Sequence, residues 1–378
     1  MSSAGPCRPC GCGHREISST SAADLLLAGP PTLQDVSDFA DVQLHVVTGK
    51  GGTGKTTVAA ALALALASGG GKVLLAEVEG RQGIAQLFDT PPLPYEERKV
   101  AVAPGGGDVY ALAIDPEQAL LDYLHMFYKL SPNGIPARTL RRMGAIDFAT
   151  TIAPGLRDVL LTGKIKEAAV RTRDKEGTAR SARPTRKGEQ PRVYDAVVLD
   201  APPTGRIARF LNISHEVGGL ARVGPIKTQS EGVMKVFRSK QTAVHLVTLL
   251  EEMPVQETID GAAELESVGL PVGGIVVNAV RTPALAPADL VEAAAGRLDT
   301  KALASTLAAA GLKTTPDVVS ALVGEAADHA ERVALEERGR DALAGLSRPT
   351  YELPQLADAV ALDSLYEMAE LLCQQGMA

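Results

Sequence analysis

Short runs of apolar residues recur along the chain, each bounded by Gly, Pro or charged residues. Runs of this length without polar alternation predict β-strands that are buried on both faces. The predicted strands are 44–47, 72–78, 109–114, 193–199, 244–250, 274–280 and a short last strand at 351–353. Helical periodicity or Ala-rich composition predicts helices at 58–67, about 255–267, 286–346 and 357–374. Strands that alternate with helices predict an α/β fold, a mostly parallel sheet of about seven or eight strands flanked by helices.

The alternation is interrupted between about 116 and 170, where no strand pattern occurs. Apolar side chains recur there at helical spacing, as at Leu140, Met143 and Ile146. This predicts a helical subdomain inserted into the sheet domain. A stripe of Leu, Met and aromatic residues is more often core than binding groove, and both interpretations remain open here.

Two polar stretches predict the remaining organisation. Residues 1–40 are rich in Ser, Gly, Pro and Cys, which predicts a flexible N-terminal extension. Residues 171–192 carry eight Lys or Arg against three Asp or Glu, which predicts a mobile basic loop, with an anionic partner as the minority interpretation. We therefore expect one domain over 41–378, with the helical insertion at about 116–170 and this loop inside it.

Composition excludes several classes of protein. The net charge of −7 argues against a general nucleic-acid binder, and the absence of Trp argues against base-stacking surfaces. No apolar run reaches the ~18–20 residues that a membrane span needs, so no transmembrane segment is expected. No charged region followed by an apolar one marks a secretory signal at the N-terminus. These features predict a soluble, cytoplasmic protein.

Three of the four cysteines, Cys7, Cys10 and Cys12, lie close together with His14 near the N-terminus. The cluster could bind a metal ion, but its spacing lacks the second pair of ligands that structural zinc sites have. Reduced thiols in an unstructured tail are the simpler interpretation.

The stretch GKGGTGKTT follows the first predicted strand and precedes an Ala/Leu-rich helix. A strand, a glycine-rich loop and a helix form the context that a phosphate-binding loop requires. The glycines let backbone N–H groups approach phosphate oxygens, and the helix N-terminus adds positive potential. Lys55 is expected to reach the β- and γ-phosphates and Thr56 to bind Mg²⁺, so the sequence predicts a nucleotide-triphosphate site. Asp200, at the end of the strand 193–199, is expected beside this loop.

Further motifs make the chain resemble one family. Lys50 precedes the glycine pair in KGGTGKTT, which resembles the deviant Walker A motif of MinD, ParA and the arsenite-pump ATPases. DAPPTGRIARFL (200–211) resembles the switch II segment of the arsenite-pump and tail-anchored-protein-targeting ATPases. EEMPVQET (251–258), IVVNAV (275–280) and YELPQL (351–356) resemble later segments of the same family, so the resemblance covers about 42–374.

The resemblance implies a role for each matching residue. Lys50 would reach across a dimer interface to the nucleotide of the other subunit, and catalysis would involve Lys50, Lys55 and the residue at position 79. Thr57 would contact the α-phosphate, Asp200 would position Mg²⁺ through its water shell, and Asn278 and Pro354 would contact adenine. The full set implied to bind ATP and Mg²⁺ is Gly49, Gly51, Gly52, Thr53, Gly54, Lys55, Thr56, Thr57, Asp200, Asn278 and Pro354.

Three departures from the family pattern change what is expected. Glu79 stands where the switch I segment of the family has the Asp that orients the attacking water. Its carboxylate suits that task, but the extra methylene predicts slow turnover, since a displacement of about 1 Å can cost ~10²-fold in rate. Beyond residue 12 only Cys373 remains, which puts the metal sites of the family in doubt. Few methionines occur near the insertion, which gives little support to tail-anchor insertion.

These motifs predict a Mg²⁺-dependent ATPase, an ATP hydrolase that acts as a nucleotide-switched dimer. The partner is either an identical chain or a paralogous ATPase, and a protein or a membrane protein is the candidate cargo. Two rival hypotheses remain. One is a weakly hydrolysing regulatory subunit of a heterodimer, motivated by Glu79. The other is a MinD/ParA-like positioning ATPase, although the 357–374 helix lacks the Lys/Arg face of a membrane anchor.

Overall fold

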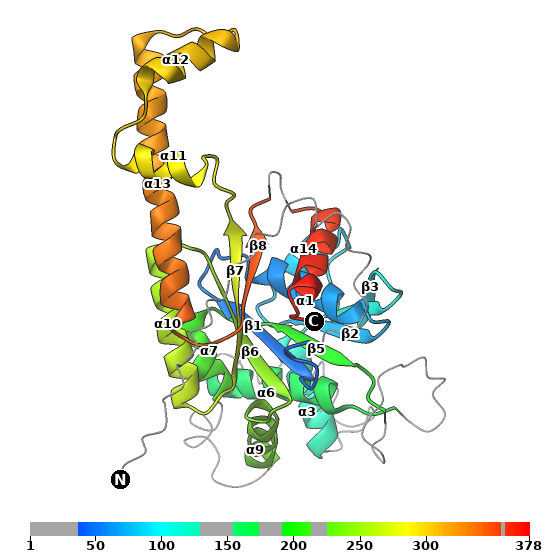
Figure 1. Cartoon of the computed structure of the whole chain (residues 1–378). Helices are drawn as coiled ribbons and strands as arrows, with labels where there is room; N and C mark the ends of the chain where they lie inside the picture. Colours follow the sequence, from blue (N-terminus) through cyan, green and yellow to red (C-terminus); the bar gives the residue numbers. More distant parts are fainter. Residues whose placement is uncertain (1–36, 129–153, 174–190, 213–224, 357–359) are drawn as a thin grey trace, which may run out of the picture. The chain divides into compact units, whose positions relative to one another are not determined.

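The computed structural model describes residues 37–128, 154–173, 191–212, 225–356 and 360–378. Its strands form one eight-stranded sheet with the spatial order β3-β4-β2-β5-β1-β6-β7-β8 (Figure 1). The strands are β1 (Leu44–Gly49), β2 (Lys72–Glu77), β3 (Arg98–Val102), β4 (Asp108–Ala113), β5 (Ala196–Asp200), β6 (Thr242–Thr248), β7 (Val272–Val280) and β8 (Thr350–Pro354). All pairings are parallel except that of β3 with β4. The predicted α/β fold with a mostly parallel sheet is confirmed.

Helices cover both faces of this sheet. Successive residues of β2 point to opposite faces, because Leu74 and Ala76 belong to one hydrophobic cluster and Val73 and Leu75 to the other. The helices are α1 (Lys55–Ala67), α2 (Gly83–Leu87), α3 (Pro116–Tyr128), α6 (Pro154–Val170), α7 (Thr204–Leu211), α9 (Pro225–Phe237), α10 (Glu252–Ser267), α11 (Pro287–Ala294), α12 (Thr300–Ala309), α13 (Pro316–Ala344) and α14 (Leu362–Gln374). Burial on both faces explains why the central strands read as continuous apolar runs.

The strand β3 lies in a stretch, 90–107, that the sequence predicts to be a loop. Its residues are mostly exposed or half-exposed, and it pairs antiparallel with β4 at one edge of the sheet. An edge strand that is not buried on both faces needs no apolar run, and Pro and Gly around it obscured the pattern. The prediction of a loop there is wrong.

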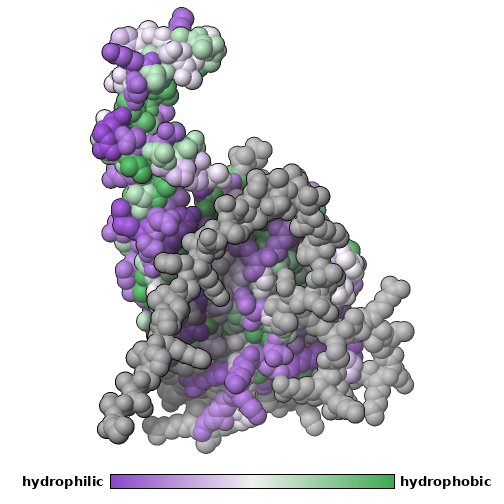
Figure 2. All heavy atoms as spheres, viewed as in Figure 1, coloured by the Kyte–Doolittle hydropathy of each residue, from purple (hydrophilic) through white to green (hydrophobic). Residues whose placement is uncertain are grey.

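The Ala-rich stretch predicted as helical at 286–346 consists of three helices, α11, α12 and α13. The helices α11 and α12 pack against α13 (Figure 1). No residue of α12 is buried, and Val291, Leu312 and Val318 are exposed apolar residues of this segment. In the view of Figure 2, hydrophilic and hydrophobic residues are intermixed over these helices.

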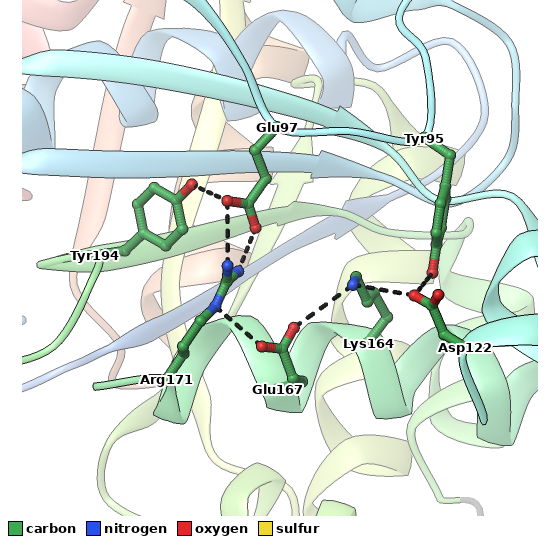
Figure 3. A network of polar contacts seen from close by, with 7 residues as sticks. All are labelled: Tyr95, Glu97, Asp122, Lys164, Glu167, Arg171 and Tyr194. Carbon is green, nitrogen blue, oxygen red and sulfur yellow. Dashed lines mark hydrogen bonds and ion pairs between the residues drawn. The ribbon is translucent and has the colours of Figure 1, made fainter. Parts of the chain in front are cut away.

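The two ends of the predicted helical insertion are helical, as α3 and α6, and residues 129–153 lie outside the described residues. A polar network joins α6 to the rest of the chain (Figure 3). Lys164 of α6 contacts Asp122 of α3 at 3.3 Å, and Asp122 accepts a hydrogen bond from Tyr95 at 2.9 Å. Arg171, just after α6, forms an ion pair with Glu97, which precedes β3. These contacts attach α6 to α3 and to the segment before β3.

The predicted basic loop 171–192 is described only at its two ends, where Thr172 pairs with Arg192 in an isolated antiparallel bridge. Of the predicted extension 1–40, the structure describes only residues from Ser37 onward. Asp38 accepts a hydrogen bond from the hydroxyl of Tyr351 in β8 at 2.5 Å, and its backbone N–H donates to Gly376 at 2.9 Å. These contacts attach the start of the described chain to β8 and to the end of α14.

Candidate functional site

The glycine-rich loop joins β1, which ends at Gly49, to α1, which begins at Lys55. Gly54 caps α1 in the left-handed conformation with φ 84°, and no side chain caps the helix. The first backbone N–H groups of α1 therefore have no capping side chain and are available to an anionic ligand. This is the geometry that the sequence predicted for a phosphate-binding loop.

Two of the loop glycines are required by close approaches. A Cβ atom at Gly49 would lie 2.1 Å from the carbonyl oxygen of Val247 in β6. A Cβ atom at Gly54 would lie 2.3 Å from Nδ2 of Asn278 in β7. No real side chain tolerates such distances, so the loop can pass β6 and β7 only as glycine. By contrast, a Cβ at Gly51 would meet nothing within 4 Å.

Thr56 and Asp200 meet beneath the loop. The Thr56 hydroxyl donates a hydrogen bond of 2.7 Å to Oδ2 of Asp200, across from α1 to the end of β5. Burial raises the pKa of Asp200 to about 6, and the hydrogen bond from Thr56 and the charge of Lys55 oppose this rise. Burial also lowers the pKa of Lys55. A buried carboxylate next to a hydroxyl is a suitable oxygen environment for a cation.

These two oxygens fit Mg²⁺ in particular, because Mg²⁺ keeps several waters and is commonly held by one or two protein ligands. Among the described residues, no group of three or more His, Cys, Asp or Glu side chains could hold a metal ion by itself. A cation here would therefore be shared with water and the phosphates of a nucleotide, which is how phosphate-loop proteins hold it.

Lys50, the residue that precedes the glycine pair, does not point into its own phosphate loop. Its Nζ atom forms an ion pair of 2.9 Å with Oε1 of Glu257 in α10. The backbone carbonyl of Lys50 instead turns toward the loop, where it accepts a hydrogen bond of 2.9 Å from the Thr53 hydroxyl. Sequence reasoning singled out the segment 251–258 but did not find Glu257 as the partner of Lys50.

Glu79 lies two residues beyond the end of β2, in the segment 78–83 that we call switch I. Its carboxylate lies 3.4 Å from Nη2 of Arg81 and 3.7 Å from Nη1 of Arg206 in α7. Its charge raises the pKa of both Lys55 and Asp200, so Glu79 lies within electrostatic reach of the phosphate loop. The structure thus brings Glu79, Lys55, Thr56 and Asp200 near one another, and their catalytic and binding roles stay predictions.

Glu77, at the end of β2, was not predicted to have a role. It is buried and accepts hydrogen bonds from the backbone N–H groups of Gln82 at 2.6 Å and Ile84 at 3.4 Å. These bonds hold switch I across the end of the sheet, where Gln82 has a positive φ of 56°. An acidic residue inside an apolar strand was the signal that could have identified this anchor.

Asn278 and Pro354, predicted to contact adenine, lie at the ends of the adjacent strands β7 and β8. Asn278 donates a hydrogen bond of 2.9 Å from Nδ2 to the carbonyl oxygen of Thr53 in the phosphate loop. Pro354 lies opposite Val280 in the strand register. Thr57 lies in the first turn of α1, half-buried. Asn278 therefore contacts the phosphate loop, and Pro354 lies beside the end of β7.

The sequence matches the anion-transporting ATPase family over residues 42–240, which include the phosphate loop, Glu79, Asp200 and switch II. It is also 54% identical over 341 residues to the ATPase BagA of Mycobacterium tuberculosis, covering 90% of this chain and 95% of that protein. This chain belongs to the anion-transporting ATPase family.

More distant members of the family match shorter parts. An arsenical pump-driving ATPase of Escherichia coli is 27% identical over 284 residues, which are 71% of this chain and 44% of the pump protein. ATPase get3 of Schizosaccharomyces pombe is 27% identical over 220 residues, which are 56% of this chain and 58% of that protein. The predicted resemblance is confirmed, and the phosphate loop is the nucleotide site of an ATPase family.

Of the four cysteines, the structure describes only Cys373. Cys7, Cys10, Cys12 and His14 lie outside the described residues. Cys373, in α14, is half-buried and lies 3.6 Å from the carbonyl oxygen of Ala65 in α1, and burial raises the pKa of its thiol. Within the described ranges no helix is long and apolar enough to cross a membrane.

Proposed function

We propose that this ATPase depends on Mg²⁺ and acts as a dimer whose subunits close on ATP and open after hydrolysis. The observation that carries the proposal is the convergence of Glu79, Lys55, Thr56 and Asp200 at the ends of β2, α1 and β5. This set contains a group for the phosphates, two oxygens for a cation and a carboxylate for water.

In this proposal the phosphates lie on the N–H groups of the loop and on Lys55. Thr56 and Asp200 would hold Mg²⁺, and a bound cation would supply positive charge for the phosphate oxygens. Asp200 must be ionised for this task. Its raised pKa of about 6 means that cation binding displaces a proton at acidic pH.

Glu79 orients the attacking water by accepting a hydrogen bond from it. Its position two residues past the end of β2, within electrostatic reach of Lys55 and Asp200, supports this role. The side chain is one methylene longer than the Asp of the family, so turnover is expected to be slow. Glu77 supports this geometry because it fixes the backbone of switch I on both sides of Gly83.

The proposed dimer gives Lys50 its function. In the single chain Lys50 is paired with Glu257, and a lysine that reaches the nucleotide of another subunit must leave this partner. The second subunit would be an identical chain or a paralogous ATPase. Its cargo is proposed to be a protein or a membrane protein, reached through the switch segments and α7.

A second candidate function is a regulatory subunit that binds ATP and turns it over weakly beside a catalytic paralogue. One specific observation favours it: two guanidinium groups, those of Arg81 and Arg206, already lie within 4 Å of the Glu79 carboxylate. A carboxylate engaged by two guanidinium groups has less capacity left to accept a hydrogen bond from water. The two candidates differ in what this chain does alone.

The test is steady-state ATPase activity with Mg²⁺ over a range of protein concentrations, with nucleotide binding measured separately. The wild type is compared with Glu79→Ala and with Glu96→Ala, which removes an exposed glutamate that also lies near an arginine. Activity that rises with concentration and is lost only in Glu79→Ala supports the dimeric ATPase. Tight ATP binding without turnover at any concentration supports the regulatory subunit.

A further inference from the structure

A small polar cavity of about 140 Å³ is lined by Glu79 and by no residue of the phosphate loop. Three parts of the chain line it: switch I with Glu79 and Arg81, α6 with Arg157, and the segment from Pro202 to the first turns of α7, with Arg206. One water needs roughly 10–15 Å³ by this kind of measure. The cavity is therefore large enough for an ion of five heavy atoms.

Three guanidinium groups face this space without filling their hydrogen-bonding capacity. Arg81 and Arg206 lie 3.4 and 3.7 Å from the Glu79 carboxylate, which is longer than a hydrogen bond. Their side chains are 73% and 62% exposed. Within the described ranges Arg157 is exposed and has no ion-pair partner. Each guanidinium has five N–H donors, so most of the donors are available to a ligand.

The charges around the cavity favour an anion. Three arginines stand against two carboxylates, those of Glu79 and Asp158, which leaves a net charge of +1. Arg81 also lowers the pKa of Lys55, so its positive charge acts on the phosphate loop. The cavity thus shares the Glu79 carboxylate with the site at which the γ-phosphate of a bound nucleotide is expected.

We propose that Arg81, Arg157 and Arg206 form a binding site for a tetrahedral phosphate group beside Glu79. The group is either the γ-phosphate of bound ATP or the inorganic phosphate that hydrolysis releases. The planar fork of a guanidinium matches two oxygens of a phosphate, and three such forks from three elements surround it on several sides. The inference rests on the proposed function, because it gives the phosphate a source.

Such a site would connect the two switch segments. Without a phosphate, Arg206 lies 3.7 Å from the Glu79 carboxylate. A phosphate that binds Arg206 would free this carboxylate to accept a hydrogen bond from the attacking water. Arg157 belongs to α6, so the same phosphate would also bind the helix at the end of the predicted insertion. Gain or loss of this phosphate would then change the contacts of α6 and of both switch segments at the same time.

Equilibrium binding tests the proposal without relying on turnover. Binding of ATP, of ADP, and of inorganic phosphate to the ADP complex is measured by calorimetry with Mg²⁺ present. The variants are Arg157→Gln and Arg206→Gln, with Arg157→Lys as a charge-preserving variant. Arg338→Gln, an exposed arginine of α13, is the matched control. Thermal melting shows that each variant is folded.

Loss of a charge-assisted contact predicts a fall in affinity of about 10- to 150-fold. If the site holds the γ-phosphate, both glutamine variants lose this factor for ATP and keep their affinity for ADP. If it holds released phosphate, they lose it for phosphate on the ADP complex and bind ATP normally. Arg157→Lys retains part of the affinity in either case. Either pattern supports the site and identifies the source.

Glutamine variants that bind all three ligands within twofold of Arg338→Gln overturn the proposal. This failure is distinct from failure of the proposed function. A wild type that hydrolyses ATP while the arginine variants bind normally keeps the function and loses the site. A wild type without turnover whose variants lose phosphate affinity keeps the site and loses the function.

Discussion

The ion pair between Lys50 and Glu257 gives the sharpest prediction about dimer formation. If Lys50 must leave Glu257 to reach a second subunit, then Glu257 opposes closure. Glu257→Gln keeps the size and shape of the side chain but removes the charge that holds Lys50. We therefore expect this variant to close into the ATP-bound dimer more readily than the wild type.

The size of the effect follows from the exposure of the pair. The side chains of Lys50 and Glu257 are 32% and 37% exposed, and their atoms are 2.9 Å apart. A partly exposed ion pair of this kind contributes about 0.2–1 kcal/mol. That corresponds to about 1.4- to 5-fold in an equilibrium constant, and a homodimer breaks two pairs. The dimerisation constant with ATP should thus improve about 2- to 30-fold.

Sedimentation velocity with Mg²⁺ and a non-hydrolysable ATP analogue measures this constant over a concentration series. Glu264→Gln removes an equal charge from the exposed face of the same helix and serves as the control. The advantage of Glu257→Gln should shrink at about 1 M salt, where the Debye length is about 3 Å. A Glu257→Gln variant that dimerises no better than Glu264→Gln at low salt would refute the reasoning, and one that dimerises less well would show that Glu257 receives the lysine of the partner.

Three further predictions concern the loop and the core. Because the raised pKa of Asp200 is about 6, the apparent Mg²⁺ affinity should fall by up to ~10-fold per pH unit below pH 6. Mg²⁺ binding to Asp200→Asn, measured from pH 5 to 8, should lack this dependence on pH. Gly54→Ala should lose at least 10-fold in ATP affinity and about 1–2 kcal/mol in stability, because φ is 84° and the new Cβ meets Asn278. Gly69→Ala, at an open position outside the phosphate loop, should change both little in calorimetry and thermal melting. Burial lowers the pKa of His245 well below 6.5. As the pH falls, the unfolded chain therefore takes up a proton at this histidine before the folded chain does. The free energy of unfolding should be highest above pH 6.5 and should fall by up to ~1.4 kcal/mol per pH unit below it. Urea unfolding of His245→Gln should show a flatter pH profile over the same range.

Much of the fold was predictable because its central strands are buried on both faces. Strands such as β1 and β6, buried along their whole length, leave a continuous apolar run that no exposed segment would carry. The strand β3 has no such run. It lies at the edge of the sheet, and all of its residues are exposed or half-exposed. Helices α11 to α13 merged into one prediction since Ala-rich composition hides the turns between them.

The candidate site likewise contains one part that the sequence predicts and another that it does not. The phosphate loop was predictable because its chemistry depends on glycines and a lysine at fixed spacing within one segment. Partners that come from distant segments were not predictable. Glu257 lies more than two hundred residues from Lys50, and Arg206 meets Glu79 only because α7 begins beside the end of β2. Such contacts depend on where helices pack, which spacing along the chain does not encode.

Three carboxylates at the ends of β2 and β5 show how the fold assigns different tasks to similar groups. Glu77 is buried and its oxygens are occupied by backbone N–H groups, so it can only hold switch I. Asp200 is half-buried with a hydroxyl and a lysine nearby, and burial raises its pKa to about 6. Glu79 alone has arginines instead of fixed partners.

These environments bear on why a glutamate can occupy position 79. The switch I backbone is fixed by Glu77, so the reach of residue 79 is set by its own side chain. An aspartate there would draw the carboxylate back by about 1.5 Å, one C–C bond length, and would weaken its contacts with both Arg81 and Arg206. The longer side chain would therefore lose some precision toward water and gain the ion pair with Arg206 of switch II.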